Sequence, residues 1–123
     1  MPPSPAVHII DDDDAVRESM AILLETYGFA VESYDSARAF LERHADGARG
    51  CVVTDVQMAE TNGLELLRTL SARDPRLPVI VITARADRGL AARAIAHGAV
   101  AFIEKPFAAK ALLDAVGTAF ARV

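Results

Sequence analysis

The stretch Val79-Ile80-Val81-Ile82-Thr83 decides the fold of this 123-residue chain. Its residues are all apolar or β-branched, and polar and apolar side chains do not alternate. This pattern is typical of a central strand covered on both faces, as in parallel sheets with helices on either side. The stretch therefore predicts an α/β fold in which short apolar runs alternate with helices.

The regions on both sides of this stretch contain the expected alternation. Four further apolar runs predict strands over residues 7–10, 30–34, 51–54 and 100–103. Helical spacing of apolar residues predicts a helix after each strand, over residues 15–27, 37–44, 64–74, 87–97 and 109–121. The result is a doubly wound, flavodoxin-like (βα)5 domain with a five-stranded parallel sheet. The expected strand order is 2-1-3-4-5, because right-handed crossovers leave few other topologies.

Local sequence patterns predict the helix ends. Asp14 is the expected N-cap of the first helix and Gly28 its C-terminal stop, while Ser36 is the expected N-cap of the second helix. Apolar residues at i, i+3, i+4 and i+7 should form the buried face of the first helix. These residues are Met20, Leu23, Leu24 and Tyr27.

Composition and length fit one soluble domain. The chain is 52% hydrophobic and 24% charged, and no apolar run approaches the roughly 20 residues that span a bilayer. A net charge of -4 argues against a nucleic-acid-binding surface, which needs clustered Lys and Arg. Residues 1–6 are expected to be a disordered lead-in, without the regions of a signal peptide, to a domain over residues 7–123. A cytoplasmic location is the simplest expectation, and the single cysteine, Cys51, is expected to be buried and inert.

Polar residues follow four of the predicted strands at the point where each strand ends. Asp11 and Asp12 follow the first strand, and Asp55 follows the third. Thr83 ends the fourth strand, and Lys105 comes shortly after the fifth. Because the carboxyl ends of parallel strands open onto one crevice, these five side chains are expected to meet there.

Three carboxylates in one crevice predict a cation site. Two carboxylates about 5 Å apart repel each other by roughly 3 kcal/mol at an effective dielectric constant near 20. Hard oxygen ligands with room for water suit Mg²⁺ or Mn²⁺. The metal and Lys105 would bring the pocket close to neutral, so that it could accept a phosphoryl group. Asp55, on the central strand, is the expected nucleophile, with Asp11 and Asp12 as metal ligands.

Structural roles are the alternative for each of these residues. Acidic side chains at a helix N-terminus interact favourably with the helix dipole, and this explanation is preferred for Asp13 and Asp14. For Asp11 and Asp12 taken alone, the helix dipole and a metal site are equally good explanations. Thr83 alone could cap the loop after its strand, and Lys105 alone could be a solvated surface lysine. The joint occurrence of Asp55, Thr83 and Lys105 at separate strand ends favours a common site.

The same residues, in this order, resemble the receiver domain of two-component response regulators, and most of all its FixJ-type branch. The resemblance covers residues 7–120. It rests on Asp11-Asp12, Thr54-Asp55-Val56-Gln57-Met58, Gly63, Val81-Ile82-Thr83-Ala84 and Phe102-Ile103-Glu104-Lys105-Pro106-Phe107. It implies a phosphoacceptor in a phosphorelay and not an enzyme, with self-phosphorylation and autodephosphorylation as its only chemistry.

The resemblance also implies the residues of the phosphorylation and metal sites. Asp55 would accept a phosphoryl group from a histidine kinase or a phosphotransfer protein. Asp12 would ligate Mg²⁺ directly, and Asp11 would assist, in part through water. Asp55 and the backbone carbonyl of Gln57 would complete the protein's share of the metal ligands.

A second group of residues would bind the phosphoryl group and report its presence. Thr83, Ala84 and Lys105 would contact the phosphoryl oxygens, and the Lys105-Pro106 peptide bond is expected to be cis, as in the family. Phe102 would be the switch aromatic that swings inward as Thr83 moves. An ordinary core position is the alternative for Phe102.

Two positions where the family tunes the loss of phosphate to water carry long side chains here. Gln57 and Arg85 each lie two residues past a key site residue. Ala59 follows Met58, where proline is common in the family, so a more mobile loop is expected. None of these departures changes the five site residues, and a functional receiver is expected.

The resemblance implies partners as well. The surface formed by the fourth helix, the fifth strand and the fifth helix would be the readout, and phosphorylation is expected to favour a homodimer through it. DNA would be bound only by a separate helix-turn-helix output domain, and no membrane is expected as a partner. A single-domain regulator and an excised receiver both remain open.

Three other functions are compatible with parts of the pattern. An aspartate-nucleophile phosphatase would need a second Asp two residues after Asp55, where Gln57 stands. A flavodoxin-like nucleotide carrier would need a Gly-, Ser- or Thr-rich loop after the first strand, where carboxylates would repel phosphate. An adaptor with a vestigial pocket is the third alternative, and a response of Asp12 and Asp55 to Mg²⁺ distinguishes it.

Overall fold

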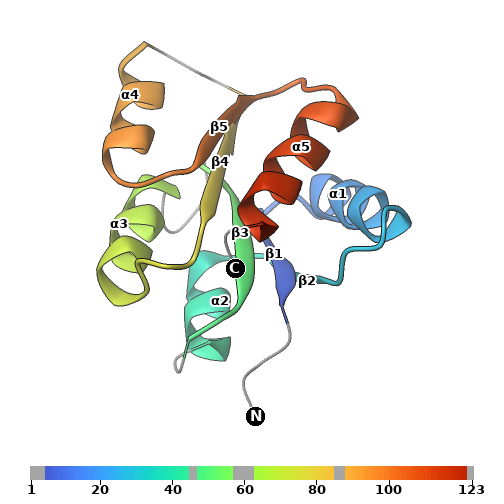
Figure 1. Ribbon diagram of the computed structural model, residues 1–123, viewed down its shortest axis with the longest axis horizontal. Coiled ribbons are helices and arrows are strands. Elements are labelled where there is room, and N and C mark those ends of the chain that lie inside the picture. Colours follow the sequence, from blue (N-terminus) through green and yellow to red (C-terminus); the bar gives the residue numbers. More distant parts are fainter. Residues whose placement is uncertain (1–4, 45–46, 57–62, 85–87, 122–123) are drawn as a thin grey trace.

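Five strands and five helices alternate along the chain in a computed structural model, which describes residues 5–44, 47–56, 63–84 and 88–121 (Figure 1). The strands are β1 (Ala6–Ile10), β2 (Val31–Tyr34), β3 (Gly50–Asp55), β4 (Val79–Thr83) and β5 (Ala101–Glu104). The helices are α1 (Asp14–Thr26), α2 (Ala37–Arg43), α3 (Gly63–Arg73), α4 (Arg88–Ala96) and α5 (Ala109–Phe120). The predicted doubly wound α/β fold is confirmed.

All five strands are parallel, and their order is β2-β1-β3-β4-β5, as predicted. β1 and β3 are neighbours, with Ile10 opposite Thr54. This register places Asp11 and Asp55 side by side at the ends of their strands. The point where the chain changes direction across the sheet is therefore also where the acidic residues meet.

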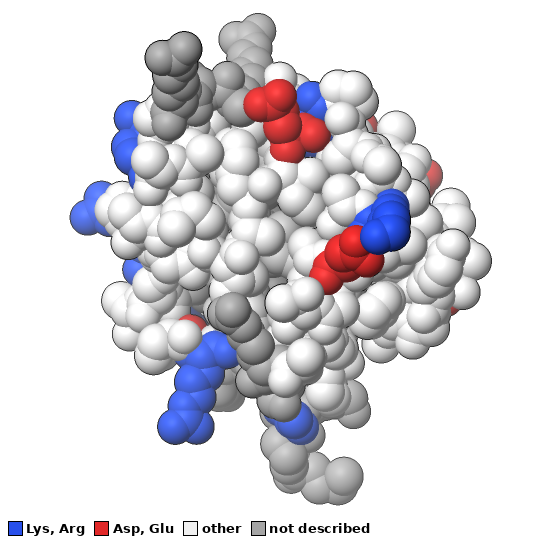
Figure 2. Space-filling view, turned by 45° about the horizontal axis from the view of Figure 1, so that its top comes forward, with Lys and Arg blue, Asp and Glu red and all other residues white. Residues whose placement is uncertain are grey.

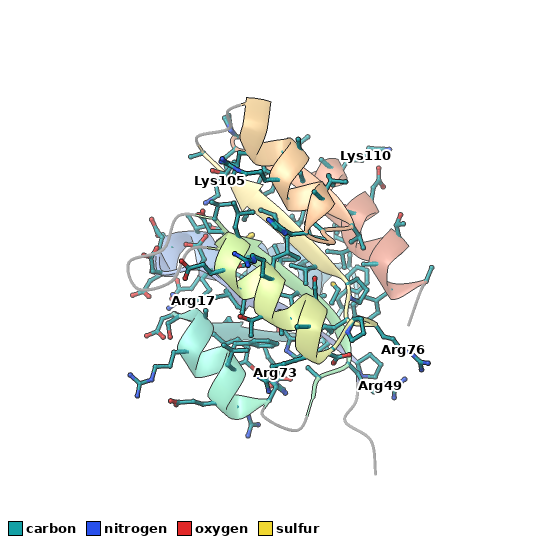
Figure 3. All side chains as sticks on the ribbon, turned by 90° about the vertical axis from the view of Figure 1, so that its left-hand side faces the viewer. Arg17, Arg49, Arg73, Arg76, Lys105 and Lys110 are labelled. Atoms are coloured by element: carbon teal, nitrogen blue, oxygen red, sulfur yellow. The ribbon has the colours of Figure 1, made fainter. Side chains whose placement is uncertain are left out.

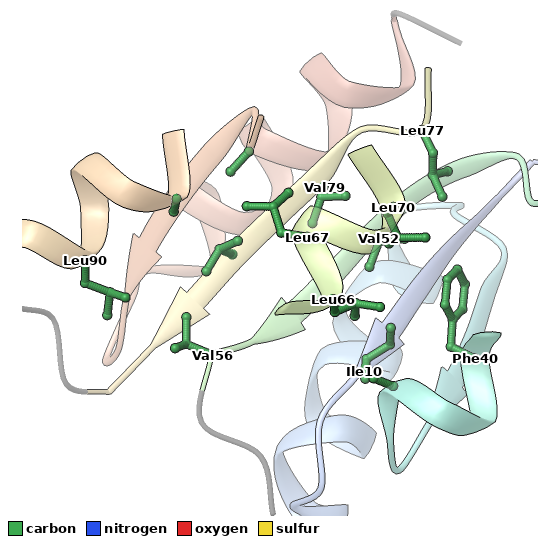
Figure 4. Close-up of a cluster of buried hydrophobic side chains, with 14 residues drawn as sticks. Ile10, Phe40, Val52, Val56, Leu66, Leu67, Leu70, Leu77, Val79 and Leu90 are labelled. Carbon is green, nitrogen blue, oxygen red and sulfur yellow. The ribbon is translucent and has the colours of Figure 1, made fainter. Parts of the chain in front are cut away.

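Helices cover both faces of the sheet in two layers (Figure 1). α2, α3 and α4 pack on one face around a buried cluster that includes Phe40, Leu67 and Val81 (Figure 4). α1 and α5 pack on the other face around Leu24, Ile80 and Leu112. Because both faces are covered, all residues of β1, β3 and β4 are buried, which explains the uninterrupted apolar runs in the sequence.

Two expectations about the first helix are wrong. The N-cap is Asp13, not Asp14, because the Asp13 side chain accepts a hydrogen bond from the Val16 backbone N–H. Tyr27 is not part of the buried face but 65% exposed, because it is the C-cap residue, where the helix ends. Gly28 follows with a φ of +92°, which fits its predicted role as the helix stop.

Other boundaries differ from the prediction by one or two residues. β1 begins at Ala6, inside the segment expected to be a disordered lead-in, because the Ala6 N–H donates to the carbonyl of Arg49 across the β1–β3 pair. Ser36 caps α2 through a hydrogen bond from the Ala39 N–H, as predicted. Asp87, the expected start of α4, lies outside the described residues.

The start of β3 depends on a glycine. Gly50 has a φ of +108°, and a Cβ at this position would lie 1.9 Å from the carbonyl oxygen of Ala6. β1 and β3 therefore approach each other as closely as they do only because residue 50 has no side chain.

In the described part of the chain, no helix is both long and apolar enough to cross a membrane.

Candidate functional site

Two aspartates from neighbouring strands form the base of the site. Asp55 is the last residue of β3, and Asp11 directly follows β1. Both are buried, with exposed fractions of 7% for Asp55 and 1% for Asp11. The sheet register brings the two carboxylates together at one edge, as the sequence predicted.

The ammonium group of Lys105 contacts both of these carboxylates. Its Nζ donates a hydrogen bond of 2.8 Å to Oδ2 of Asp55 and lies 3.4 Å from Oδ2 of Asp11. The Lys105 backbone N–H donates to the carbonyl of Thr83, which fixes the start of the loop after β5 beside the end of β4. Lys105 extends towards the carboxyl ends of the strands (Figure 3), and its side chain is 20% exposed. The Lys105–Pro106 peptide bond is cis.

The electrostatics of the pocket favour a bound cation. Burial raises the pKa of the Asp11 carboxyl above its ordinary value, against the hydrogen bond from the Asp13 N–H and the charge of Lys105. Burial alone would lower the pKa of Lys105, but its hydrogen bond to Asp55 and the charges of both aspartates outweigh burial and raise it. Lys105 therefore stays charged, whereas the negative charge on Asp11 is only partly compensated.

Asp12 and Arg17 lie at the start of α1, next to this pair. Asp12 is exposed, so that its side chain lies towards solvent at the mouth of the site. Asp11 Oδ1 accepts a hydrogen bond of 2.9 Å from the Asp13 N–H, and Arg17 Nη1 donates one of 2.7 Å to the Asp11 carbonyl. Arg17 also forms an ion pair with Asp14. The loop that carries Asp11 and Asp12 is thus fixed from both sides.

Arg17 was missed by sequence reasoning. Its position three residues after Asp14 is visible in the sequence as an i, i+3 pair, but such pairs are common on helix surfaces. The second contact of Arg17, to the Asp11 carbonyl, depends on the angle between the axes of β1 and α1. That angle has no pattern of its own in the sequence.

Thr83, Ala84 and Phe102 lie on the β4–β5 side of the site. Thr83 is completely buried at the end of β4, and Ala84 follows it at the surface. Phe102 is half-buried and packs against the cluster under α3 and α4. Gln57 and Arg85, expected to supply a metal-binding carbonyl and to tune phosphate loss, lie outside the described residues.

The donor set fits a hard divalent cation. Three aspartates and one lysine carry a formal charge of -3 + 1 = -2, which one Mg²⁺ or Mn²⁺ ion would balance. Carboxylate oxygens with access to water are the ligands that these ions prefer. Asp11 and Asp55 are joined through Lys105, and these two, with the exposed Asp12 beside them, are the residues that would hold such an ion.

Lys and Arg side chains do not gather into a continuous stripe among the described residues on the face that Figure 2 shows. Charged residues there are scattered among uncharged ones.

Comparison with known proteins points to one family. A family model described as the response regulator receiver domain matches residues 7–117. The transcriptional regulatory protein FixJ of Azorhizobium caulinodans is 51% identical over 122 residues, which cover 99% of this chain and 58% of that protein. The chain thus spans little more than half the length of this relative.

Solved structures of receiver domains resemble this chain as well. The crystal structure of FixJ-N matches with a TM-score of 0.89 and 41% identity, over 98% of this chain and 97% of that one. The solution structure of the beryllofluoride-activated NtrC4 receiver domain dimer matches with a TM-score of 0.89 and 28% identity, over 94% and 96% of the two chains. The resemblance inferred from the motifs is thereby confirmed: the chain belongs to the family of response regulator receiver domains and is similar to its FixJ-type members.

Proposed function

We propose that this receiver accepts a phosphoryl group on Asp55, with Mg²⁺ or Mn²⁺, from a histidine kinase or a phosphotransfer protein. The observation that carries the proposal is the position of Lys105 Nζ, 2.8 Å from Asp55 and 3.4 Å from Asp11. This arrangement sets a fixed positive charge beside the oxygen that would attack phosphorus.

Asp55 suits the role of nucleophile better than Asp11. Asp11 is 1% exposed, and its Oδ1 accepts a hydrogen bond from the Asp13 N–H while its Oδ2 lies near Lys105. Asp55 is more accessible, at the end of a central strand. A phosphoryl donor can therefore reach Asp55 with less rearrangement of the loop after β1.

The transfer exchanges one bond to phosphorus for another. The P–N bond of a donor phosphohistidine breaks, an Asp55 carboxylate oxygen forms a P–O bond, and the imidazole leaves with the electron pair. Lys105 would move its hydrogen bond from the carboxylate to a phosphoryl oxygen. Asp11, Asp12 and Asp55, with the carbonyl of Gln57, would hold the metal, which supplies neutralisation of the phosphoryl charge when bound.

The donor has an apolar surface on which to dock. A hollow beside Lys105, between α1 and the start of α5, is lined by Val16, Met20, Pro106 and Phe107 among others. Because Asp55 is nearly buried, a protein donor must cover this edge of the domain to bring its phosphohistidine within reach. An apolar surface next to the charged pocket suits such a partner.

Phosphorylation would act through Thr83, Ala84 and Phe102 on the surface formed by α4, β5 and α5. Phosphate can shift a conformational equilibrium only if it binds one state better than the other, and Thr83 and Lys105 would make those differential contacts. The activated state is proposed to form a homodimer, as in the beryllofluoride-activated NtrC4 receiver dimer. A separate output domain would bind DNA, since the chain covers 58% of a FixJ regulator.

Intact mass after incubation with acetyl phosphate and Mg²⁺ tests the proposal. The parent chain should gain the mass of one phosphate, and Asp55→Asn should abolish the gain. Asp114→Asn removes an exposed carboxylate on α5 and should gain phosphate like the parent. A gain that survives Asp55→Asn would identify another nucleophile. Absence of any gain, together with unchanged Asp12 and Asp55 amide signals in millimolar Mg²⁺, would favour an adaptor with a vestigial pocket.

A further inference from the structure

A second group of ligand-type side chains lies on the α2 face of the sheet, away from the acidic pocket. His8 on β1 and Glu32 on β2 are register partners on neighbouring strands. His44 is the C-cap residue of α2, which packs over this corner. One nitrogen from each histidine and one carboxylate oxygen all lie within 4.8 Å of one another.

The histidine on β1 has a defined tautomer. His8 Nε2 lies 2.9 Å from the carbonyl oxygen of Arg49. A carbonyl oxygen can only accept, so Nε2 carries the proton and Nδ1 presents a bare lone pair. Metal-binding histidines are commonly oriented in this way, with the second ring nitrogen donating to a backbone carbonyl.

The lone pair of His8 Nδ1 is buried and lacks a hydrogen-bond partner within the described residues. The residue is 1% exposed, and Nδ1 lies 3.9 Å from Oε2 of Glu32. A lone pair that faces a carboxylate is unfavourable unless a positive charge lies between them.

The opposite side of the carboxylate faces the second histidine. Glu32 Oε1 lies 4.0 Å from Nε2 of His44. The Tyr34 hydroxyl donates to the same Oε1 at 3.2 Å and lies 2.7 Å from His44 Nε2. The hydroxyl has one proton, so when it donates to Glu32 its oxygen accepts a hydrogen bond from the Nε2–H of His44.

Aromatic packing holds the two imidazoles in place. The rings of His8 and His44 meet edge to face with centroids 4.8 Å apart, and Phe40 packs on His8 at 5.4 Å. Ligands of a tetrahedral zinc site lie about 2.1 Å from the metal, and hence about 3.4 Å from one another. Ligand atoms that lie up to 4.8 Å apart must therefore approach by up to about 1.4 Å. This closure needs a shift of the half-exposed Glu32 side chain and of the His44 ring at the end of α2.

We propose that His8, Glu32 and His44 form a binding site for a divalent transition-metal ion, with zinc as the ion whose ligand preferences fit best. Two imidazoles and a carboxylate suit zinc, whereas magnesium prefers oxygen ligands alone. His8 Nδ1, His44 Nε2 and one Glu32 oxygen are the ligands, and a water completes the tetrahedron. Bound zinc ties the C-terminal end of α2 to β1 and β2.

The site has a route for entry. Side-chain exposures are 39% for Glu32 and 13% for His44, compared with 2% for His8. An ion can therefore reach the site past Glu32. Its binding displaces the Tyr34 hydroxyl from His44 and requires the proton on His44 Nε2 to pass through water to Nδ1, so that the Nε2 lone pair can bind the metal. Tyr34 then retains its hydrogen bond to Glu32 as a donor to a ligating carboxylate.

A zinc titration followed by long-range ¹H–¹⁵N correlation of the imidazoles tests the site. Millimolar Mg²⁺ is kept in the buffer, so that zinc competes poorly for the acidic pocket. We expect one Zn²⁺ per chain, with shifts at His8 Nδ1 and His44 Nε2. His97, the third histidine of the chain, should not shift.

Matched variants separate this site from other ways of binding zinc. His44→Gln and Glu32→Gln should each weaken zinc binding by about tenfold or more, whereas His97→Gln should leave it unchanged. Both test positions are partly exposed, so the variants should remain folded, and a thermal melt checks this. Zinc binding that is equal in His44→Gln and His97→Gln would overturn the proposal. So would protonation of His8 Nδ1 near neutral pH without zinc, because a proton would then supply the missing charge.

Discussion

Lys105 Nζ lies 2.8 Å from Oδ2 of Asp55, although 50 positions separate the two residues in the sequence. The same ammonium lies 3.4 Å from Oδ2 of Asp11, 94 positions away. One lysine therefore bridges two buried carboxylates that belong to neighbouring strands. Because it reduces their mutual repulsion, it should stabilise the fold as well as serve phosphotransfer.

Replacement of this lysine should reveal the repulsion. Lys105→Met is expected to lower the free energy of unfolding by about 2 kcal/mol, because it removes the cation that lies between two buried carboxylates. Urea unfolding measures the loss, and Mg²⁺ should restore more stability to the variant than to the parent. Lys110→Met, which removes an exposed pair with Asp114, should cost less than about 0.5 kcal/mol. Equal losses in the two variants would contradict the buried bridge.

Gly50 should not tolerate a side chain. Gly50→Ala would place a Cβ 1.9 Å from the Ala6 carbonyl oxygen and force a residue with a side chain into a φ of +108°. We expect a loss of several kcal/mol, on the order of the largest single-site effects. Gly117→Ala, in the open middle of α5, should instead stabilise the chain by about 0.5–1 kcal/mol. Thermal melts of both variants give the comparison, and a mild effect at residue 50 would mean that β1 can move away.

Cys51 should make the fold sensitive to alkaline pH. Burial raises the pKa of the Cys51 thiol from 9.0 to about 12, so above pH 9 the unfolded chain loses this proton while the folded chain keeps it. The contribution of the buried thiol to the free energy of unfolding is therefore fully present below pH 9. It should be lost at about 1.4 kcal/mol per pH unit between roughly pH 9 and pH 12. Urea unfolding at pH 8 and pH 10 measures the slope. Cys51→Ala should lack this component, and an identical slope in that variant would assign the loss to other groups.

Ile95 should contribute to the activated dimer. It is 53% exposed on α4, within the surface proposed as the readout. Ile95→Asp should weaken beryllofluoride-induced dimerisation by about tenfold or more in analytical ultracentrifugation, because a charge would be buried in the interface. Ile22→Asp changes an equally large exposed residue on α1 and should dimerise normally. A parent chain that stays monomeric with beryllofluoride would remove the dimer from the proposed function.

The sheet, and the pair of Asp55 and Lys105 at its edge, could both be predicted from the strands in the sequence. Uninterrupted apolar runs marked the buried strands, and the rule for parallel sheets brought Asp55 and Lys105 to one edge. The helix caps were less predictable. Four consecutive aspartates offer several possible N-caps, and only the backbone geometry selects Asp13.

The group formed by His8, Glu32 and His44 had no pattern in the sequence. Its members are 24 and 12 positions apart, and each histidine taken alone is an ordinary residue of a strand or a helix end. Their meeting depends on the register of β1 with β2 and on where α2 ends, which the apolar pattern fixes only to within a residue or two.

The position of β5 as the last strand has a consequence for synthesis. A nascent chain that has emerged from the ribosome only as far as β4 can already pair β1 with β3, because all of these strands precede residue 84. At that stage Asp11 and Asp55 can lie side by side, but Lys105 is still inside the ribosome and cannot reach them. The two carboxylates therefore repel each other without their lysine until β5 and Lys105 have emerged and completed the sheet.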